Sequence, residues 1–329
     1  MATPAWISLG SNLGDREATL DAAVAALAET PGIAVRSVST YHETAPVGGP
    51  AGQGAFLNAA ARLETTLEPL HLLDVMQAIE ARAGRVRAVR WGERTLDLDL
   101  LIFGAKFLDT LRLKLPHPRL AFRRFVLGPL TEIAPAMVDT MTRRTIADLL
   151  ARLDRRPRLL ALAGPPGPSR SSVFRGLIEG LDAFAIGEAE IAEAPDLAND
   201  PGQRSVADFE RKAAAVSAAL WRRPASRVDW IVSDYCLDRE VARIRSSIRH
   251  FLADPAWGKS RTDTFYAGIR RVQEAEKLAL EPTLAVALPD SEWERRPGHA
   301  AFPVLWPESN KPEAIVAEIL ATCRGIEGA

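Results

Sequence analysis

Strand-like and helix-like segments alternate through the first half of the chain, and this alternation limits the fold more than any other feature. Apolar and β-branched residues predict strands over residues 5–9, 35–42, 56–65 and 96–103. Apolar residues at helical spacing predict helices that begin at Asp15 and Pro69, and others over 125–133 and 146–153. The connections are short and some strands follow one another as in hairpins, so we expect an open α+β sandwich.

The pattern breaks near residues 154–158, and in the region that follows helical segments alternate with short apolar runs. An apolar run at 159–163 leads into a loop of Gly, Pro and Ser at 164–172. Helical patterns then occupy 173–181, 205–222, 238–253, 264–280 and 312–323, with short apolar runs at 229–233 and 283–288. This order is typical of a parallel α/β domain, and 329 residues suffice for about two domains. We therefore expect one domain over residues 1–157 and another over 158–329.

Composition excludes several classes of protein. The apolar fraction of 47% and the charged fraction of 25% are those of a globular chain, not a disordered one. No apolar run approaches the ~18 residues of a membrane span, and the two cysteines, Cys236 and Cys323, form no CxxC pair. A net charge of −1 gives no strong basic field. We expect a cytoplasmic protein without a signal peptide and with neither a membrane nor a nucleic acid as partner.

Two carboxylates at Asp97 and Asp99 alternate with leucines in the predicted strand over 96–103. Side chains two residues apart on a strand share one face and lie about 6–7 Å apart. Carboxylates that close repel each other unless a cation lies between them, and hard oxygen ligands suit Mg²⁺ that holds nucleotide phosphates. The alternative is a half-exposed strand with two solvated acids, which is common for an isolated pair of this kind.

Five arginines within thirteen residues precede this strand, at positions 82, 85, 87, 90 and 94, with Trp91 among them. Gly84 and Gly92 predict a loop here, and guanidinium groups bind phosphate with two hydrogen bonds. A solvated basic face and an RNA-binding surface are the alternatives. The adjacent Asp97 and Asp99 weaken both, because without a metal they would repel a phosphate backbone.

Residues 90–101, RWGERTLDLDLL, closely resemble the signature of the 6-hydroxymethyl-7,8-dihydropterin pyrophosphokinase family of folate biosynthesis. Other stretches of the family match in the same order over residues 1–155. They are residues 7–14, 41–48, 56–58, 79–80, 84–87, 115–118 and 125–135. The resemblance implies a ferredoxin-like α+β fold and transfer of the diphosphate of ATP to the pterin hydroxymethyl group, with release of AMP.

Applied residue by residue, the resemblance implies a set of roles around ATP and two Mg²⁺ ions. Asp97 and Asp99 would bind the metal ions, and together with Arg85 and Arg94 they form the implied catalytic set. The implied nucleotide contacts are Gln77, Glu80, Arg87, Arg90, Leu100, Arg112, His117 and Arg123. For His117 the alternative is a structural histidine between two prolines.

The resemblance also implies a pocket for the pterin. Phe56 and Phe125 would stack on the two ring faces and Asn58 would bind the amide edge, as a flat polar heterocycle requires. The remaining contacts would come from Thr44, Ala45, Val47 and Trp91. Ala45 and Phe56 stand where proline and tyrosine are frequent in the family, and both keep the character of the pocket. Without the family context, the two phenylalanines would be interpreted as core residues.

The second region resembles deoxynucleoside kinases less specifically. Residues 164–171, GPPGPSRS, keep the first Gly and the last Ser of a phosphate-binding P-loop. Arg170 replaces the Lys of that motif, and three prolines remove backbone N–H groups. We expect a P-loop kinase-like α/β fold with a parallel sheet that is degenerate in function and that mediates a homodimer. A bifunctional enzyme that phosphorylates nucleosides and a non-catalytic nucleotide- or RNA-binding protein remain as alternatives.

Overall fold

The computed structural model describes residues 2–50, 52–85, 92–164, 167–186, 229–234, 282–289, 295, 297 and 302–328. The chain divides into two compact units. The first comprises Met1–Arg155, Trp293–Leu305 and Ala317–Ala329, and the second Arg156–Glu292 and Trp306–Val316. Two C-terminal segments therefore belong with the N-terminal unit. The expected division into continuous domains of 1–157 and 158–329 stays a prediction.

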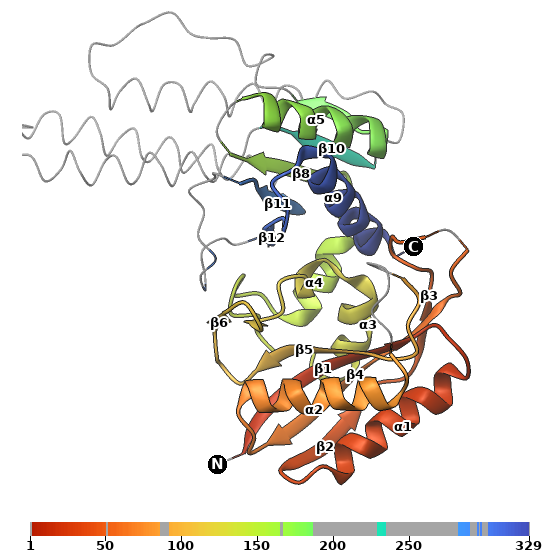
Figure 1. Cartoon of the computed structure of the whole chain (residues 1–329). Helices are drawn as coiled ribbons and strands as arrows, with labels where there is room; N and C mark the ends of the chain where they lie inside the picture. The colour runs from red at the N-terminus through yellow and green to blue at the C-terminus, as the bar shows by residue number, and fades with distance from the viewer. Residues whose placement is uncertain are drawn as a thin grey trace, which may run out of the picture. The chain divides into compact units, whose positions relative to one another are not determined.

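An antiparallel sheet forms the centre of the first unit (Figure 1). Its strands β1 (Thr3–Ser11), β2 (Ile33–Val38), β4 (Phe56–Thr65) and β5 (Asp97–Phe103) follow the order β2-β4-β1-β5, and β3 (His42–Thr44) pairs with β4. Short strands β6 (Leu108–Asp109) and β7 (Lys114–Leu115) pair separately. The α+β sandwich predicted from the alternating segments is confirmed.

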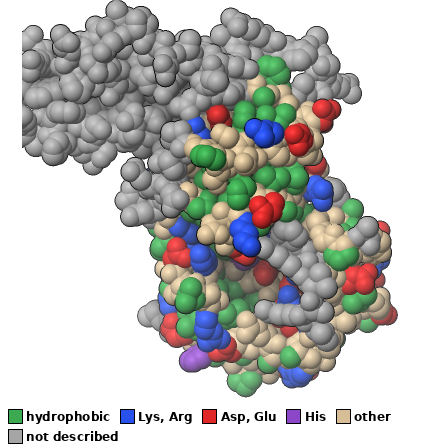
Figure 2. All heavy atoms as spheres, turned by 45° about the horizontal axis from the view of Figure 1, so that its top comes forward, with side chains coloured by type: hydrophobic (Ala, Val, Ile, Leu, Met, Phe, Trp, Pro, Cys, Tyr) green, Lys and Arg blue, Asp and Glu red, His purple; other side chains and the backbone are tan. Residues whose placement is uncertain are grey.

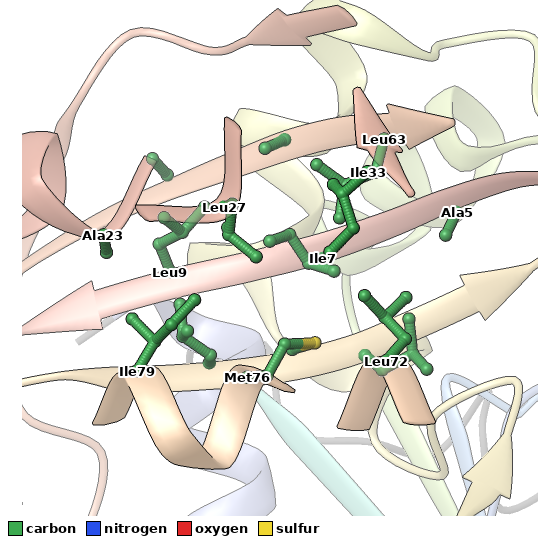
Figure 3. Packing of buried hydrophobic residues seen from close by; sticks show 14 of the residues in the cluster. Ala5, Ile7, Leu9, Ala23, Leu27, Ile33, Leu63, Leu72, Met76 and Ile79 are labelled. Atoms are coloured by element: carbon green, nitrogen blue, oxygen red, sulfur yellow. The ribbon is translucent and has the colours of Figure 1, made fainter. Parts of the chain in front are cut away.

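Helices α1 (Arg16–Glu29) and α2 (Pro69–Arg82) cover one face of this sheet. Asp15 caps α1 by accepting a hydrogen bond from the backbone N–H of Ala18 at 3.0 Å, and Pro69 occupies the first turn of α2. Figure 3 shows the apolar side chains between the sheet and both helices. Alternate residues of β1 enter this core, so the intervening residues of β1 face the other side of the sheet.

Helices α3 (Arg124–Ile133) and α4 (Ile146–Leu153) lie on that other side (Figure 1), and the 3₁₀ helix η1 (Leu120–Phe122) precedes α3. A reciprocal capping box between Thr145 and Asp148 begins α4. Helices thus cover both faces of the sheet.

The strand predicted over residues 35–42 is wrong in its extent. β2 ends at Val38 and β3 begins at His42. Between them, the backbone N–H of Ala60 donates to Oγ of Ser39 at 2.9 Å instead of to a backbone carbonyl. This side chain replaces one partner of the strand ladder, and the chain turns before it pairs with β4 again.

The second unit contains strands β8 (Arg158–Ala163), β9 (Phe184–Ile186), β10 (Trp230–Ser233) and β11 (Leu284–Ala287). They are parallel, and β11, β8, β10 and β9 are neighbours in that order. All six residues of β8 are buried, as expected for a parallel strand covered on both faces. The predicted parallel α/β arrangement is confirmed for these strands.

Helix α5 (Pro168–Leu181) follows β8 and begins five residues before the predicted helix, because Pro168 suits the first helical turn. Strand β12 (Val304–Leu305) and helix α9 (Pro312–Glu327) complete the described elements. The helices predicted over 205–222, 238–253 and 264–280 lie outside the described residues. Among the residues that are described, no helix has both the length and the apolar character needed to cross a membrane.

Candidate active site

Strand pairing brings the predicted pterin and metal residues together over Gly10. This residue of β1 pairs with Asn58 of β4 on one side and with Asp97 of β5 on the other. A Cβ atom at Gly10 would lie 3.2 Å from Oδ1 of Asn58, 3.9 Å from Cδ1 of Phe56 and 4.0 Å from Cβ of Asp97. The missing side chain therefore leaves space between these three residues. Gly10 was not among the predicted site residues, although it lies in the family motif of residues 7–14.

The alternation predicted for β5 is confirmed. Leu98 and Leu100 belong to the apolar core, whereas the side chains of Asp97 and Asp99 are only partly buried. Leu100 is 3% exposed. Because the side chain of Leu100 packs in the core, the predicted nucleotide contact would have to use the Leu100 backbone.

Two guanidinium groups bind opposite oxygens of Asp97. Nη2 of Arg85 lies 2.7 Å from Oδ1, and Nη1 of Arg94 lies 2.6 Å from Oδ2. Arg85 also pairs with Glu80, whose Oε1 accepts the backbone N–H of Leu98 at 2.8 Å. The structure therefore brings four of the predicted residues into one charged network: Glu80, Arg85, Arg94 and Asp97.

Asp99 has its own cationic partner. Nη1 of Arg123 donates to Oδ2 of Asp99 at 2.7 Å, and Nε2 of His117 lies 3.9 Å from the same oxygen. Burial raises the pKa of Asp99. In the acidic range where Asp99 titrates, His117 is protonated too, and its charge, that of Arg123 and the hydrogen bond from Arg123 outweigh burial and hold the pKa of Asp99 well below its ordinary value. Asp99 is thus an anion across the physiological range.

His117 is a neutral residue at this site. Burial lowers its pKa to about 4. The carboxylate of Asp99 opposes the shift, and three guanidinium groups add to it, those of Arg123, Arg119 and Arg295. Its Nδ1 accepts the backbone N–H of Arg119 at 3.1 Å, which leaves Nε2 to carry the proton and face Asp99.

We expect the imidazole NMR signals of His117 to titrate near pH 4 rather than near the ordinary 6.5. The unfolded chain binds this proton at higher pH than the native protein does. The free energy of unfolding should therefore fall as pH drops through the interval from 6.5 to about 4. A His117→Asn variant assigns the signals and should show a smaller fall. A titration midpoint near 6.5 would contradict the buried, neutral histidine.

Two of the residues predicted for the pterin, Thr44 and Phe56, lie beside Asn58. Its Nδ2 donates to Oγ1 of Thr44 at 2.9 Å, and Thr44 pairs with Phe56 across β3 and β4. Asn58 is 5% exposed, whereas Phe56 and Phe125 are half-buried and outside the core cluster around β1. This partial exposure favours a binding role for the two rings over the alternative of core packing. The guanidinium of Arg123 lies 5.6 Å from the ring centre of Phe125.

Asn12 is a positioning residue that the sequence-based prediction missed. Its Oδ1 accepts the backbone N–H of Arg94 at 2.8 Å, and its own backbone N–H donates to the Arg94 carbonyl at 3.2 Å. Its Nδ2 donates to the carbonyl of Gly54 at 3.3 Å. Asn12 thereby ties Arg94 and the loop before β4 to the end of β1. The Ser-Asn pair at residues 11 and 12, inside the family motif of residues 7–14, could have indicated this role from the sequence.

Other predicted residues are not part of this network as described. Gln77 is exposed on α2. Nη2 of Arg112, which lies outside this helix, pairs with Oδ1 of Asp74 on α2 at 2.5 Å. Ala45 is exposed and Val47 is half-buried in the segment after β3. The predicted residues Arg87, Arg90 and Trp91 lie outside the described residues.

Comparison with known proteins identifies the family of this chain. A family model of 7,8-dihydro-6-hydroxymethylpterin-pyrophosphokinase (HPPK) matches residues 6–135. The 2-amino-4-hydroxy-6-hydroxymethyldihydropteridine pyrophosphokinase of Bacillus subtilis is 50% identical over 129 residues, which are 39% of this chain and 77% of that protein. The Pseudomonas aeruginosa enzyme of the same name is 48% identical over 130 residues, 40% of this chain and 80% of that protein. The chain belongs to the HPPK family.

Membership makes the chain a pyrophosphokinase of folate biosynthesis, as the sequence motifs predicted. HPPK-containing fusions also occur among the relatives. A "Bifunctional protein FolKE" of Lactococcus lactis is 33% identical over 183 residues, 56% of this chain and 51% of that protein. A crystal structure of Plasmodium falciparum HPPK-DHPS A437G with STZ-DHP aligns with 57% of each chain, at 12% identity and a TM-score of 0.37.

Proposed function

We propose that the first unit transfers the diphosphate of ATP to 6-hydroxymethyl-7,8-dihydropterin through the residues gathered around Gly10. The observation that carries the proposal is the space over Gly10, with Asn58 and Phe56 on one side and Asp97 on the other. A substrate that joins a flat heterocycle to a phosphate acceptor fits such an arrangement. The heterocycle would face β4 and the phosphates would face β5.

In this proposal the pterin lies between Phe56 and Phe125, and its amide edge binds Asn58. The hydrogen bond from Asn58 to Thr44 fixes which amide atoms are available, because Nδ2 is already a donor to Oγ1. Ala45, Val47 and Trp91 would complete the pocket. The half-buried rings support this role, since stacking on a ligand requires an accessible ring face.

Asp97 and Asp99 would hold two Mg²⁺ ions together with phosphate oxygens of ATP. Both are carboxylates on one face of β5, and oxygen atoms are the ligands that Mg²⁺ prefers. The described residues include no group of three or more His, Cys, Asp or Glu side chains able to hold a metal. This fits Mg²⁺, which commonly uses one or two carboxylates and takes the rest of its ligands from substrate and water. When bound, the metal neutralises charge on the phosphates.

The reaction needs positioning and charge neutralisation more than a strong base. The hydroxymethyl oxygen would bond to the β-phosphorus of ATP, the bond from that phosphorus to the α,β-bridging oxygen would break, and AMP would leave with the bridging oxygen. The hydroxyl proton would pass to water. Arg85 and Arg94 would bind the transferred phosphates, and Arg123 and His117 would orient the nucleotide beside Asp99. Gln77, Glu80, Arg87, Arg90 and Arg112 would contribute further nucleotide contacts.

The test is incubation of the full chain with ATP, Mg²⁺ and 6-hydroxymethyl-7,8-dihydropterin, with nucleotides separated by chromatography. We expect AMP to form only when the pterin is present, in equal amount to the pyrophosphorylated pterin. Absence of AMP would overturn the proposal. Unsubstituted pterin is the matched control, because it fits the ring pocket but has no hydroxymethyl group to accept the diphosphate.

A purely nucleic-acid-binding role is less well supported. Three described arginines of the site pair with carboxylates, namely Arg85 and Arg94 with Asp97 and Arg123 with Asp99. On the face shown in Figure 2, basic and acidic side chains of the described residues lie interspersed. Such pairing suits a small anionic substrate better than an extended phosphate backbone.

For the second unit, the deoxynucleoside-kinase-like fold remains a proposal. What supports it is the succession of β8, a loop and α5 beside a parallel sheet. Nη1 of Arg170 donates to the carbonyl of Gly164 at 3.2 Å, so this side chain folds back on the loop where a kinase Lys would face phosphate. We therefore expect no ADP when deoxynucleosides replace the pterin in the same assay. Light scattering would test the predicted homodimer.

A further inference from the structure

The first unit contains two segments from the far C-terminal end of the chain, Trp293–Leu305 and Ala317–Ala329. Neither lies within residues 6–135, over which the HPPK family model matches. Most of their described apolar residues are shielded from solvent: Phe302 is 2% exposed, and Ile319 and Ile326 are 0% exposed. These segments are thus integral to the unit that contains the site.

A buried ion pair joins the second of these segments to the loop after β7. Nη2 of Arg119 lies 2.7 Å from Oε1 of Glu318, whose side chain is 2% exposed. A carboxylate removed from water is costly unless it is paired, so the pair fixes Arg119 against α9. Arg119 is two residues from His117 and donates its backbone N–H to that imidazole.

Arg295 holds the same loop from its other end. Its guanidinium donates to the carbonyl of Pro116 and, at 3.2 Å, to the carbonyl of Leu108. The group also lies 5.4 Å from the ring centre of Phe107 and 3.8 Å from Oδ2 of Asp109. Its side chain is only 5% exposed, and Pro116 directly precedes His117.

Two more contacts extend this attachment toward the pterin side. Nε of Arg124 donates to the carbonyl of Ile326 at 3.2 Å. A Cβ atom at Gly325 would lie 3.4 Å from the Phe122 carbonyl oxygen and 3.5 Å from Cγ1 of Val47. The backbone of α9 at Gly325 therefore packs against Phe122 and Val47. Residues 116–124 are held by the C-terminal segments along most of their length.

We infer that Arg295 and Glu318 are positioning residues for the part of the HPPK site that binds the nucleotide, namely His117 and Arg123 beside Asp99. Both contact the loop that carries His117 and Arg123, the two residues that face Asp99. Neither touches the proposed substrates. Their effect is to fix the backbone of residues 116–124, and through it the direction of the His117 and Arg123 side chains. The inference rests on the proposed function, because it deepens the role of that site.

The test compares full-length Glu318→Gln and Arg295→Lys variants with wild type. Gln keeps the shape of Glu318 but removes its charge, and Lys keeps the charge of Arg295 but cannot bind both carbonyls with a planar fork. We expect each variant to raise Kd for Mg²⁺-loaded α,β-methylene-ATP and KM for ATP by about tenfold. The KM for the pterin should change less than about twofold. Matched controls are Glu313→Gln and Arg324→Lys, which alter exposed residues of α9.

A structural role alone would lower thermal stability without separating the two KM values. A double-mutant cycle makes the distinction sharper. Arg119→Gln alone should weaken nucleotide binding, and Arg119→Gln combined with Glu318→Gln should weaken it no further than the worse single variant. Additive effects, or unchanged Kd and KM in both Glu318→Gln and Arg295→Lys, would overturn the inference.

Nucleotide binding is measured without turnover, so the two proposals fail separately. Absence of pterin-dependent AMP formation in wild type overturns the proposed function. Binding of the ATP analogue that is equal in wild type and variants overturns the positioning role instead.

Discussion

Replacing Asp97 by Ala is expected to lower pterin-dependent AMP formation by at least ~10³-fold. Metal ions and their ligands supply several kcal/mol of charge stabilisation in such reactions, and each 1.36 kcal/mol is a factor of ten in rate. The loss should persist at saturating ATP and Mg²⁺. Pterin binding should survive, because Asn58 and Phe56 lie on β4, which β1 separates from the strand of Asp97, β5. Turnover by rapid quench and pterin affinity by fluorescence give the two quantities.

A second substitution separates this effect from a general loss of structure. Asp97→Asn keeps the size of the side chain and should lose activity to a similar degree, since a neutral amide is a poor ligand for Mg²⁺. Glu64→Gln is the matched control on β4, where Glu64 pairs with Arg36 and Arg62 away from the site. Wild-type turnover in Asp97→Ala would show that the metal assignment is wrong.

Replacing Gly10 by Val should raise the Kd for the pterin by roughly 10- to 100-fold. The Cβ atom would already lie 3.2 Å from Oδ1 of Asn58, and the two further methyl groups would enter the space assigned to substrate. Overpacking costs about 1–3 kcal/mol, which corresponds to a change in affinity of roughly 5- to 160-fold. Isothermal titration with the pterin measures the change.

Gly14→Ala is the contrasting variant. Gly14 has φ +65°, and a Cβ atom there would meet nothing within 4 Å. Alanine at this position should lower the melting temperature through backbone strain and leave pterin affinity unchanged. If Gly10→Val binds pterin as tightly as wild type, the space over Gly10 is not the pterin site.

Local chemistry explains why much of the fold could be predicted. The alternation of Asp97, Leu98, Asp99 and Leu100 fixes which face each side chain takes, because a strand repeats every two residues. Helix α4 begins and ends where the periodicity predicted, since Thr145 and Asp148 form a local capping box. The strand predicted over residues 35–42 failed because Ser39 replaces a backbone partner, an effect that depends on the neighbouring strand β4.

The sequence alone determined the family, the acid pair, the arginines and the aromatic residues, since each is a local motif with its own chemistry. Only the tertiary structure decided that Gly10 separates Asn58 from Asp97, because strand order and register come from pairing between distant segments. It also decided that Arg295 and Glu318 hold the loop of His117. These contacts join residues 179 and 199 positions apart, and no periodicity along the chain specifies a hydrogen bond or an ion pair over that separation.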